Sequence, residues 1–533
     1  MRAQIPLSLT LAAVGVLWLS GCPNRGVVCT EGLSACQEAC VDLASDRRHC
    51  GGCGVSCQVG QMCQEGSCLC EGGREPCEGS CVVTSTDPRH CGGCGQACAP
   101  GQVCEQRACK AACELGSSTR CGDSCVDLSS STAHCGGCGA SCDPSQSCRQ
   151  GSCTYDVVAA CFTNGQLTGL RSDSLAKGPN AQLGTGPAAL ASLEGVLLVA
   201  DGIDNALYQA RLSAGPDGGA FAPLPESVPT GAVPNQVWVD TPFVYLVNAA
   251  SGTLQVLRKG ASDAGFAADA GLGLGTVAEL NFGPNTYPEA IAQVGSFLYV
   301  PLYGGFGASG ASAGQSVKKV DVSEPHSPVV AGTFDLSALD LKPFDGGSPV
   351  PRPYAAIAHR GKVYVALNNL NPDTYAVEGP GLLARIDPGT GALDVVELGE
   401  GCLNPAWLAS DGTHLAVSCQ GRAVYSPSFA LESVEKTGVV LFDENGTRTA
   451  TWNVACPAGG DGGCLPVQSG RLAIQDGKVF VGDQNGGRIF VLEISNNQLV
   501  ERAGFNAARP PVQACAVDPM TNYSNVSDVL AVP

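Results

Sequence analysis

Cysteines and a recurring histidine are the residues of this sequence with the clearest chemical potential. The chain has 31 cysteines, and 24 of them lie between Cys29 and Cys153. They form three sets of eight with nearly equal spacing, each centred on the string His-Cys-Gly-Gly-Cys-Gly-x-x-Cys. Thiolates and an imidazole at this spacing can bind zinc, whereas pairs of thiols can form disulfides. The residues of the three centres are His49, Cys50, Cys53, Cys57, His90, Cys91, Cys94, Cys98, His134, Cys135, Cys138 and Cys142.

Disulfides explain these sets better than a metal does. The stretch from Cys29 to Cys153 has no Ile, Phe, Tyr or Trp and only five Leu, so repeats of about 40 residues need cross-links in place of a core. Three thiolates used for zinc would leave an odd number of cysteines, whereas eight can pair completely. We therefore expect disulfide-rich repeats at 29–68, 70–109 and 113–153, without a metal site. Spacing alone does not choose among the 105 pairings that eight cysteines allow.

The N-terminus carries a targeting signal. Arg2 precedes an apolar run, Leu7 to Leu19, that is too short to cross a bilayer and has the length of a signal-peptide core. The run ends in Leu19-Ser20-Gly21-Cys22, which resembles the bacterial lipobox. The resemblance implies a signal peptide at 1–21, acyl chains such as palmitate on Cys22, and a lipidated tether at 22–28. An ordinary secretory signal is the alternative. Pro23 in place of Asp favours the outer membrane or cell surface over the inner membrane.

Composition excludes several classes of protein. The chain has 49 acidic and 30 basic residues and a formal charge of −19, so it would repel DNA or RNA. A hydrophobic content of 44% argues against general disorder, and 70 Gly with 34 Pro argues against a helical protein. We expect many short strands joined by turns, and no nucleic-acid partner.

A phrase of two short strands recurs after Tyr155, and a second hairpin such as 381–396 follows it. Four antiparallel strands in about 50 residues make one blade of a β-propeller. The pattern predicts an all-β fold in which a seven-bladed propeller occupies 155–533, and six or eight blades are also compatible with it. The copies of the phrase lie at 187–201, 235–248, 288–300, 354–366, 405–418 and 470–482.

The two ends of this region are expected to share the last blade. Val512 to Val517 and Asp528 to Val532 read as a first hairpin, and Val157 to Leu170 reads as a second. Joining them would close the ring and remove its open edges.

Both regions resemble known families. The cysteine sets resemble the repeats of myxobacterial-type surface lipoproteins, which implies a role in display or spacing. The blades resemble YVTN, lactonase-like or NHL-like propellers through Lys-Val-Tyr-Val-Ala (362–366) and Ala-Arg-Ile-Asp-Pro-Gly-Thr-Gly (384–391). That resemblance implies the fold. Metal-dependent members collect Glu, Asn and Asp at the mouth of the channel.

Six cysteines lie in the propeller region. Cys402 and Cys419 bracket one hairpin, and Cys456 and Cys464 bracket a Gly-rich connection, so both pairs are candidate bridges. Cys161 and Cys515 remain, and a bridge between them would lock the closing blade. The first and third strands of a blade are not neighbours, which argues against that last pairing.

Catalytic-looking strings have simpler explanations. Gly305 to Gly310 matches a dinucleotide fingerprint and Gly310 to Gly314 a nucleophile elbow, but both fall in a Gly/Ala/Ser loop where no helix is expected to follow. His326, His359 and His414 belong to different blades. His359 closes an inner-strand phrase and could face the channel, although packing is the usual role of a lone histidine.

Acid-rich turns are the remaining candidate ligand sets. They are 201–205, 461–463 and 483–485. Asp and Asn favour turns because they hydrogen-bond their own backbone, and none of these strings has the full spacing of a calcium loop. We expect no required cofactor, with calcium or another divalent ion in the propeller as the alternative.

These features favour a membrane-anchored extracytoplasmic lipoprotein. Its stapled repeats would form a stalk that displays a propeller able to bind a protein or carbohydrate ligand. The alternatives are a metal-dependent lactonase or other hydrolase, and a structural protein of the cell envelope. The sequence favours binding over catalysis and does not identify the ligand.

Overall fold

The computed structural model describes residues 34–36, 39–58, 61–70, 74–77, 80–111, 113, 118–212, 221–260, 271–425, 431–454, 466–505, 507, 509–517 and 523–532. Strands dominate these residues, and their single α-helix is α1 (Gly307–Ala311). The predicted all-β propeller preceded by disulfide-rich repeats is confirmed. No helical segment in the described ranges has the length and hydropathy of a membrane span. The chain divides into two compact units, Met1–Thr84 and Ser85–Pro533.

Short antiparallel hairpins build the repeats. Each pairs two strands of three or four residues across a tight turn, and β7 also pairs with β10. The strands are β1 (Ser34–Cys36), β2 (Ala39–Val41), β3 (Gln61–Gln64), β4 (Ser67–Cys70), β5 (Glu75–Cys77), β6 (Ser80–Val82), β7 (Val103–Glu105), β8 (Ala108–Lys110), β9 (Ser118–Cys121), β10 (Ser124–Asp127), β11 (Ser147–Arg149) and β12 (Ser152–Thr154).

The third repeat shows one complete disulfide pattern. Its cysteines pair first with third, second with fifth, fourth with seventh and sixth with eighth. The bridges described in the other two repeats follow the same order. Disulfides in this number suggest an extracytoplasmic protein, because reducing compartments do not preserve them. The bridges are Cys113–Cys125, Cys121–Cys138, Cys135–Cys148, Cys142–Cys153, Cys36–Cys53, Cys50–Cys63, Cys57–Cys68, Cys70–Cys81, Cys91–Cys104 and Cys98–Cys109.

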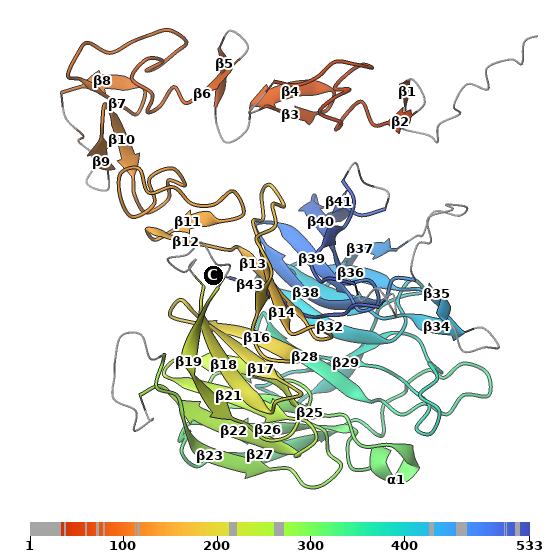
Figure 1. Cartoon of the computed structure of the whole chain (residues 1–533). Coiled ribbons are helices and arrows are strands. Elements are labelled where there is room, and N and C mark those ends of the chain that lie inside the picture. Colours follow the sequence, from red (N-terminus) through yellow and green to blue (C-terminus); the bar gives the residue numbers. More distant parts are fainter. Residues whose placement is uncertain are drawn as a thin grey trace, which may run out of the picture. The chain divides into compact units, whose positions relative to one another are not determined.

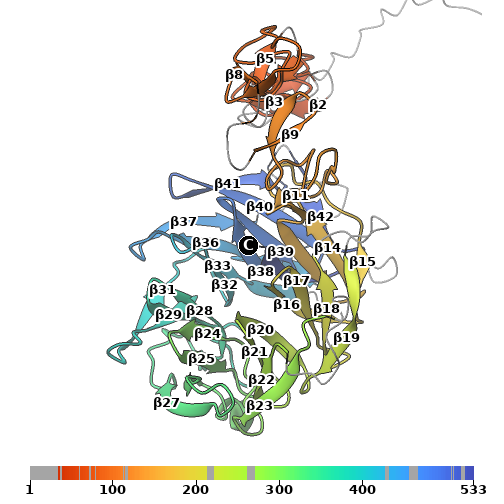
Figure 2. The same ribbon diagram turned by 90° about the vertical axis from the view of Figure 1, so that its left-hand side faces the viewer.

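Seven antiparallel sheets follow among the described residues, and Figure 2 shows their first strands near the middle and their last strands at the rim. From inner to outer strand, the first two sheets are β43 (Val526–Ala531), β13 (Val157–Cys161), β14 (Gln166–Leu170) and β15 (Ala181–Gln182), and then β16 (Pro187–Leu193), β17 (Val196–Asp201), β18 (Ala206–Arg211) and β19 (Ala222–Pro229). The third and fourth sheets are β20 (Pro234–Asp240), β21 (Phe243–Asn248), β22 (Thr253–Arg258) and β23 (Gly275–Asn281), and then β24 (Ala292–Val294), β25 (Phe297–Leu302), β26 (Ser316–Asp321) and β27 (Val329–Asp335). The fifth and sixth sheets are β28 (Pro353–His359), β29 (Lys362–Leu367), β30 (Leu382–Ile386) and β31 (Leu393–Glu397), and then β32 (Pro405–Ser410), β33 (Leu415–Cys419), β36 (Gly438–Phe442) and β37 (Arg448–Asn453).

The last sheet contains β38 (Ser469–Gln475), β39 (Lys478–Asp483), β40 (Arg488–Ser495) and β41 (Gln498–Ala503), with β42 (Val512–Gln513) also on β40. A separate hairpin, β34 (Arg422–Tyr425) and β35 (Leu431–Glu435), is inserted between β33 and β36.

The hydrophobic core is divided among the spaces between neighbouring sheets. One cluster of buried side chains fills each space, such as the cluster of Val158, Leu197 and Phe221 between the closing sheet and the β16 sheet. The same holds around the rest of the ring. Strand β43 contacts both β16 and β38, so the C-terminal strand closes the circle (Figure 1).

The closing sheet differs from the expected one. Residues 512–517 and 528–532 do not pair as a hairpin, because β42 pairs with β40 and β43 pairs directly with β13. Strand β41 covers only Val491–Ser495 of β40, which leaves the start of β40 free to pair with β42. The C-terminus therefore supplies one strand of this sheet, and β15 completes it from the other side.

Asp156 joins the third repeat to the propeller. Its carboxylate accepts hydrogen bonds from the guanidinium of Arg149 (2.9 Å), the hydroxyl of Ser147 (2.8 Å) and the backbone N–H of Ser172 (2.9 Å). Its backbone carbonyl accepts from the N–H of Val532 (2.8 Å). Burial alone would raise the pKa of Asp156, but the hydrogen bonds from Ser172, Ser147 and Arg149 hold it below its usual value.

We expect Asp156→Ala to lower the free energy of unfolding by about 2–3 kcal/mol, because it leaves Arg149 and its other donors without their buried acceptor. Urea unfolding would measure the loss. The carboxylate contribution is present above the unfolded pKa of 3.8 and disappears as the pH falls through the lower folded value. Asp123→Ala is a suitable control, because Asp123 is exposed and forms an exposed ion pair with Arg120 at 3.4 Å. Equal losses for the two variants would contradict this account of the junction.

Candidate functional site

β-bulges mark the start of the innermost strands. The pairing register shifts at the first residues of β16, β20, β28, β32 and β38, and near the start of β43. A bulge inserts an extra residue and redirects side chains. At these positions the sequence places Asn235, Tyr354 and Arg471, and Asp528 lies beside the bulge of β43. Polar side chains are thereby gathered at one end of the channel.

Arg471 is the centre of this group. Its guanidinium donates to the backbone carbonyl of Asn235 (2.6 Å), on a different blade, and lies over the ring of Trp407 with 4.1 Å from Cζ to the ring centroid. Its Nε lies 3.5 Å from Oδ1 of Asp528. Asp528 in turn accepts from the backbone N–H of Leu190 (2.6 Å). One cation therefore connects inner strands from several blades.

A second buried carboxyl group interacts electrostatically with Arg471. Glu289, just before β24, accepts a hydrogen bond from the side-chain amide of Asn235. Burial raises the pKa of Glu289 to about 7, and the charge of Arg471 and the Asn235 bond oppose that rise only in part. Burial also raises the pKa of Asp528, again against Arg471. The charge of Arg471 thus acts on two buried carboxyl groups, and Asp528 is the one in ion-pair contact with it.

Aromatic rings continue the group around Arg471 beyond Trp407. Tyr354 packs edge-on against Trp407 (4.6 Å between centroids) and Tyr303 packs against Tyr354 (5.5 Å). The fully buried Arg352 lies 5.0 Å from the Tyr303 ring centroid and donates to the carbonyls of residues 304 and 305. Burial raises the pKa of both tyrosines, so they remain neutral.

A cavity of about 390 Å³ occupies the channel beside this group. Its polar lining comes from Ser192, Gln236, Arg471 and Asp528, and its walls include the rings of Trp238 and Trp407. Leu, Val and Ala side chains of the inner strands line the rest. The volume is typical of sites for small molecules, and these have the same mixture of apolar walls and few polar groups.

The high pKa of Glu289 predicts a pH-dependent stability. An unfolded glutamate titrates near 4.5 and the folded one near 7, so the free energy of unfolding should decrease as pH rises between these values, by on the order of 3 kcal/mol. Glu289→Gln should remove this decrease and make the protein more stable than wild type above pH 7. Urea titrations at pH 5, 6, 7 and 8 would measure it. Parallel pH profiles for the two proteins would contradict the prediction.

Among the described residues, no hydrogen bond joins one propeller histidine to another, although the charge of His414 acts on His359. His359 is buried and its Nδ1 lies 2.7 Å from the hydroxyl of Ser410, and burial lowers its pKa. His326 packs edge-on against Phe243, and His414 contacts Asp411 and Asn497. Each has a local packing role.

The acid-rich turns use their carboxylates for the backbone. Asp201 accepts from four N–H groups, those of residues 185, 186, 203 and 204, at 2.8–2.9 Å. Asp483 forms an ion pair with Arg488 (2.6 Å) and accepts from the N–H of Asn485 (3.0 Å). Residues 461–463 lie outside the described residues.

The glycine-rich strings form the connection between β25 and β26. Contrary to expectation, this loop contains a helix, α1, but it has only five residues. Gly310 packs against the backbone of Gly305, and Gly314 against Gly304, so the small residues serve a close turn of the chain.

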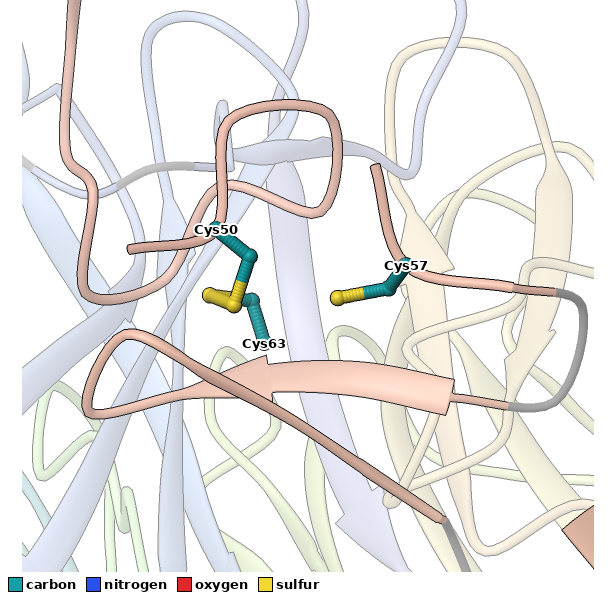
Figure 3. A group of neighbouring side chains, drawn as sticks. All are labelled: Cys50, Cys57 and Cys63. Atoms are coloured by element: carbon teal, nitrogen blue, oxygen red, sulfur yellow. A yellow bond between two sulfur atoms is a disulfide. The ribbon is translucent and has the colours of Figure 1, made fainter. Parts of the chain in front are cut away.

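The cysteine centres are disulfide-bonded. Figure 3 shows Cys50 bridged to Cys63, with the sulfur of Cys57 nearby; Cys57 is bridged to Cys68. In the part of the chain that is described, three of the four sets of close metal-ligand atoms are such neighbouring disulfide cysteines, and the fourth is Glu105 with the bridged Cys113 and Cys125. None lies in the channel. The sulfur atoms that lie close together in these repeats are therefore already used in disulfide bridges.

The recurring histidine closes a turn. Nδ1 of His49 accepts from the N–H of Gly54 (3.0 Å), His90 from Gly95 (3.0 Å), and His134 from Gly139 (2.9 Å). Gly139 has a positive φ of 79°, which favours glycine. The His-Cys-Gly-Gly-Cys-Gly string is therefore a turn motif between two bridged cysteines.

His134→Ala should lower the free energy of unfolding by about 1 kcal/mol through loss of this hydrogen bond. His134→Asn should lose less, because its side-chain oxygen can replace Nδ1 as acceptor. Thermal unfolding of the two variants would compare them. If asparagine and alanine were equally destabilising, the acceptor role would be wrong.

Two cysteine pairs of the propeller are bridged, Cys161–Cys515 and Cys402–Cys419. The objection to the first pair fails because Cys161 lies on the second strand of its sheet, next to the inner strand, and Cys515 follows β42. Cys456, Cys464 and the proposed lipidation residue Cys22 lie outside the described residues.

The channel residues were not singled out from the sequence. The available signal was a charge within an inner-strand phrase that is otherwise apolar, as in Pro-Glu-Ala-Ile-Ala (288–292) and Gly-Arg-Leu-Ala-Ile (470–474). Charged side chains are rarely buried unless they are paired, so two such phrases of opposite charge could have suggested a meeting point.

The model of the stigma-specific STIG1-like protein family matches residues 105–156. No curated protein matches the chain. Among solved structures, a putative 6-phosphogluconolactonase from Bacteroides fragilis NCTC 9343 is 13% identical, with 71% of this chain and 97% of that one covered and a TM-score of 0.45. A putative 6-phosphogluconolactonase from Bacteroides uniformis ATCC 8492 is 14% identical, with 67% and 97% covered and a TM-score of 0.44. Apo AztD from Citrobacter koseri is 13% identical, with 67% and 96% covered and a TM-score of 0.41.

Proposed function

We propose that this protein is a lipid-anchored extracytoplasmic binding protein whose propeller takes a small ligand into its central channel. The observation that carries the proposal is the cavity of about 390 Å³, where inner strands from several blades bring Arg471, Asp528 and two tryptophans together. Buried charges lower the stability of the fold, so their presence at such a position favours a functional role. Ligand recognition is the commonest such role in a pocket of this size.

The anchor rests on the lipobox-like string ending at Cys22, and its expected place is the outer membrane or cell surface. The repeats, similar to those of myxobacterial-type surface lipoproteins, would act as a spacer between the lipid and the propeller. Two acyl chains or more give stable membrane attachment, whereas one is marginal. Cys22→Ser should move the protein from the membrane fraction to the soluble fraction, and labelled palmitate should no longer be incorporated.

The channel can be tested independently of the anchor. A thermal-shift screen of the full chain against a library of small metabolites should yield ligands that raise the unfolding temperature. Ser192→Phe places a large ring in the cavity, so it should abolish these shifts. Thr333→Phe, at an exposed position on the outer strand β27, is the matched control and should leave the shifts unchanged. A failure of every ligand to stabilise the protein would favour a purely structural role.

A further inference from the structure

The polar groups of the channel determine which class of ligand it can hold, and this inference rests on the function proposed above. Arg471 is the cation of the cavity lining, and Asp528 lies 3.5 Å from it. An anionic ligand would therefore meet a carboxyl group beside the guanidinium. It would have to displace Asp528, whose oxygens also accept from the N–H groups of Leu190 and Val529.

A cationic ligand fits no better. The face of Trp407 that could attract a cation is covered by the guanidinium of Arg471 at 4.1 Å. A second positive charge in the cavity would be repelled by Arg471. Charge complementarity thus disfavours ligands of either sign and favours a neutral one.

Hydrogen-bonding chemistry narrows the class further. Asp528 can only accept and Arg471 can only donate, while Ser192 and Gln236 can do both. A hydroxyl group both donates and accepts, so a ligand with several hydroxyls can satisfy all four residues. Nε of Arg471 lies 3.5 Å from Asp528, and the buried Nε1 of Trp407 has no hydrogen-bond partner among the described residues.

The walls of the cavity restrict the class of ligand further. Trp238 lines the cavity while its indole N–H donates to Gln293 (2.6 Å), Arg471 covers one face of Trp407, and aliphatic side chains line the remainder. A sugar ring has an apolar C–H face that packs on such rings and a hydroxyl edge that meets the polar groups. A cavity of about 390 Å³ lies at the small end of ligand sites. We infer that the channel binds a neutral carbohydrate of one or two rings, in preference to a sugar acid, a sugar phosphate or an amino sugar.

Isothermal titration calorimetry on the detergent-solubilised full chain would test this inference. The panel consists of glucose, galactose, mannose, maltose and cellobiose as neutral sugars, glucuronate and glucose 6-phosphate as anions, and glucosamine as a cation. At least one neutral sugar should bind and quench tryptophan fluorescence. Its charged counterparts should bind at least about ten-fold more weakly.

Variants connect the binding to the cavity. Trp238→Ala should weaken binding of the neutral sugar about ten-fold, because it removes the ring surface. Trp452→Phe is the matched control, since Trp452 lies on the outer strand β37 and contacts Glu501 instead of the channel. Circular dichroism would establish that both variants are folded. Should Trp238→Ala be misfolded, Trp238→Leu gives the same comparison with the volume largely kept.

Each outcome has a distinct meaning. Tighter binding of glucuronate, glucose 6-phosphate or glucosamine than of any neutral sugar would overturn the inferred ligand class but leave the channel as a binding site. If no sugar binds but a non-sugar metabolite does, and Ser192→Phe abolishes that binding, the inferred ligand class is again wrong and the channel is still a binding site. If neither the sugars nor the metabolite library bind, both the inference and the proposed function fail.

Discussion

Replacing Cys161 and Cys515 together by alanine is expected to lower the free energy of unfolding by about 5 kcal/mol, the larger loss of the two propeller bridges that the structure describes. The two cysteines are separated by 354 residues, and the stabilisation from a cross-link grows with the length of the loop it closes, reaching about 4.7 kcal/mol for a loop of about 100 residues. Both positions are buried, and the bridge ties β13 to the segment between β42 and β43.

The Cys402–Cys419 bridge is the natural control. Its sequence separation is 17, for which the same relation gives about 3 kcal/mol. Urea unfolding of the two double-alanine variants under oxidising conditions would compare them, with limited proteolysis of residues 523–532 as a second measurement. A smaller loss for the 161–515 pair than for the 402–419 pair would show that the ring closes without help from its covalent link.

Arg471→Met is expected to cost about 3–5 kcal/mol, the second large effect. It leaves the buried Asp528 and Glu289 without their shared cation, and breaking a buried ion pair on one side exposes the full cost of the remaining charge. Asp528→Asn should cost less, because Arg471 keeps Glu289 as a partner. The two single variants are therefore unequal, although each breaks the same ion pair.

A double variant separates charge from packing. Arg471→Met with Asp528→Asn should be more stable than Arg471→Met alone, since the second change removes one uncompensated carboxyl. The exposed pair Arg422–Glu435 is the control, and its loss should cost at most about 1 kcal/mol. Chemical unfolding curves would measure all four proteins. Equal losses for Arg471→Met and Asp528→Asn would mean that Glu289 does not interact with the guanidinium.

The local pattern of the sequence was sufficient to predict most of the fold. The paired strands of each blade, for example 361–366 after 354–359, are short and mostly apolar, and glycine marks the turn between them. Each strand could therefore be recognised without knowledge of its distant neighbours. The repeats were recognisable for a different reason, because equal cysteine spacing is visible in the sequence itself.

Long-range contacts explain what the pattern could not give. The disulfide order depends on how hairpins fold back on one another, and β42 is a two-residue strand whose partner was set by the free end of β40. The channel group joins Asn235 and Arg471 across 236 positions of the sequence. No local periodicity records such a meeting, since the bulges that turn these side chains inward appear only when two strands are paired.

The arrangement around Asp156 has a mechanical consequence. If the protein is tethered through its N-terminus, any tension enters the ring just before β13, where Asp156 holds Val532. Separation of β13 from its neighbours could then proceed only through residues 157–160 before it reached the covalent link at Cys161. A protein pulled by its tether would thus lose its stalk contacts before it lost its circular shape.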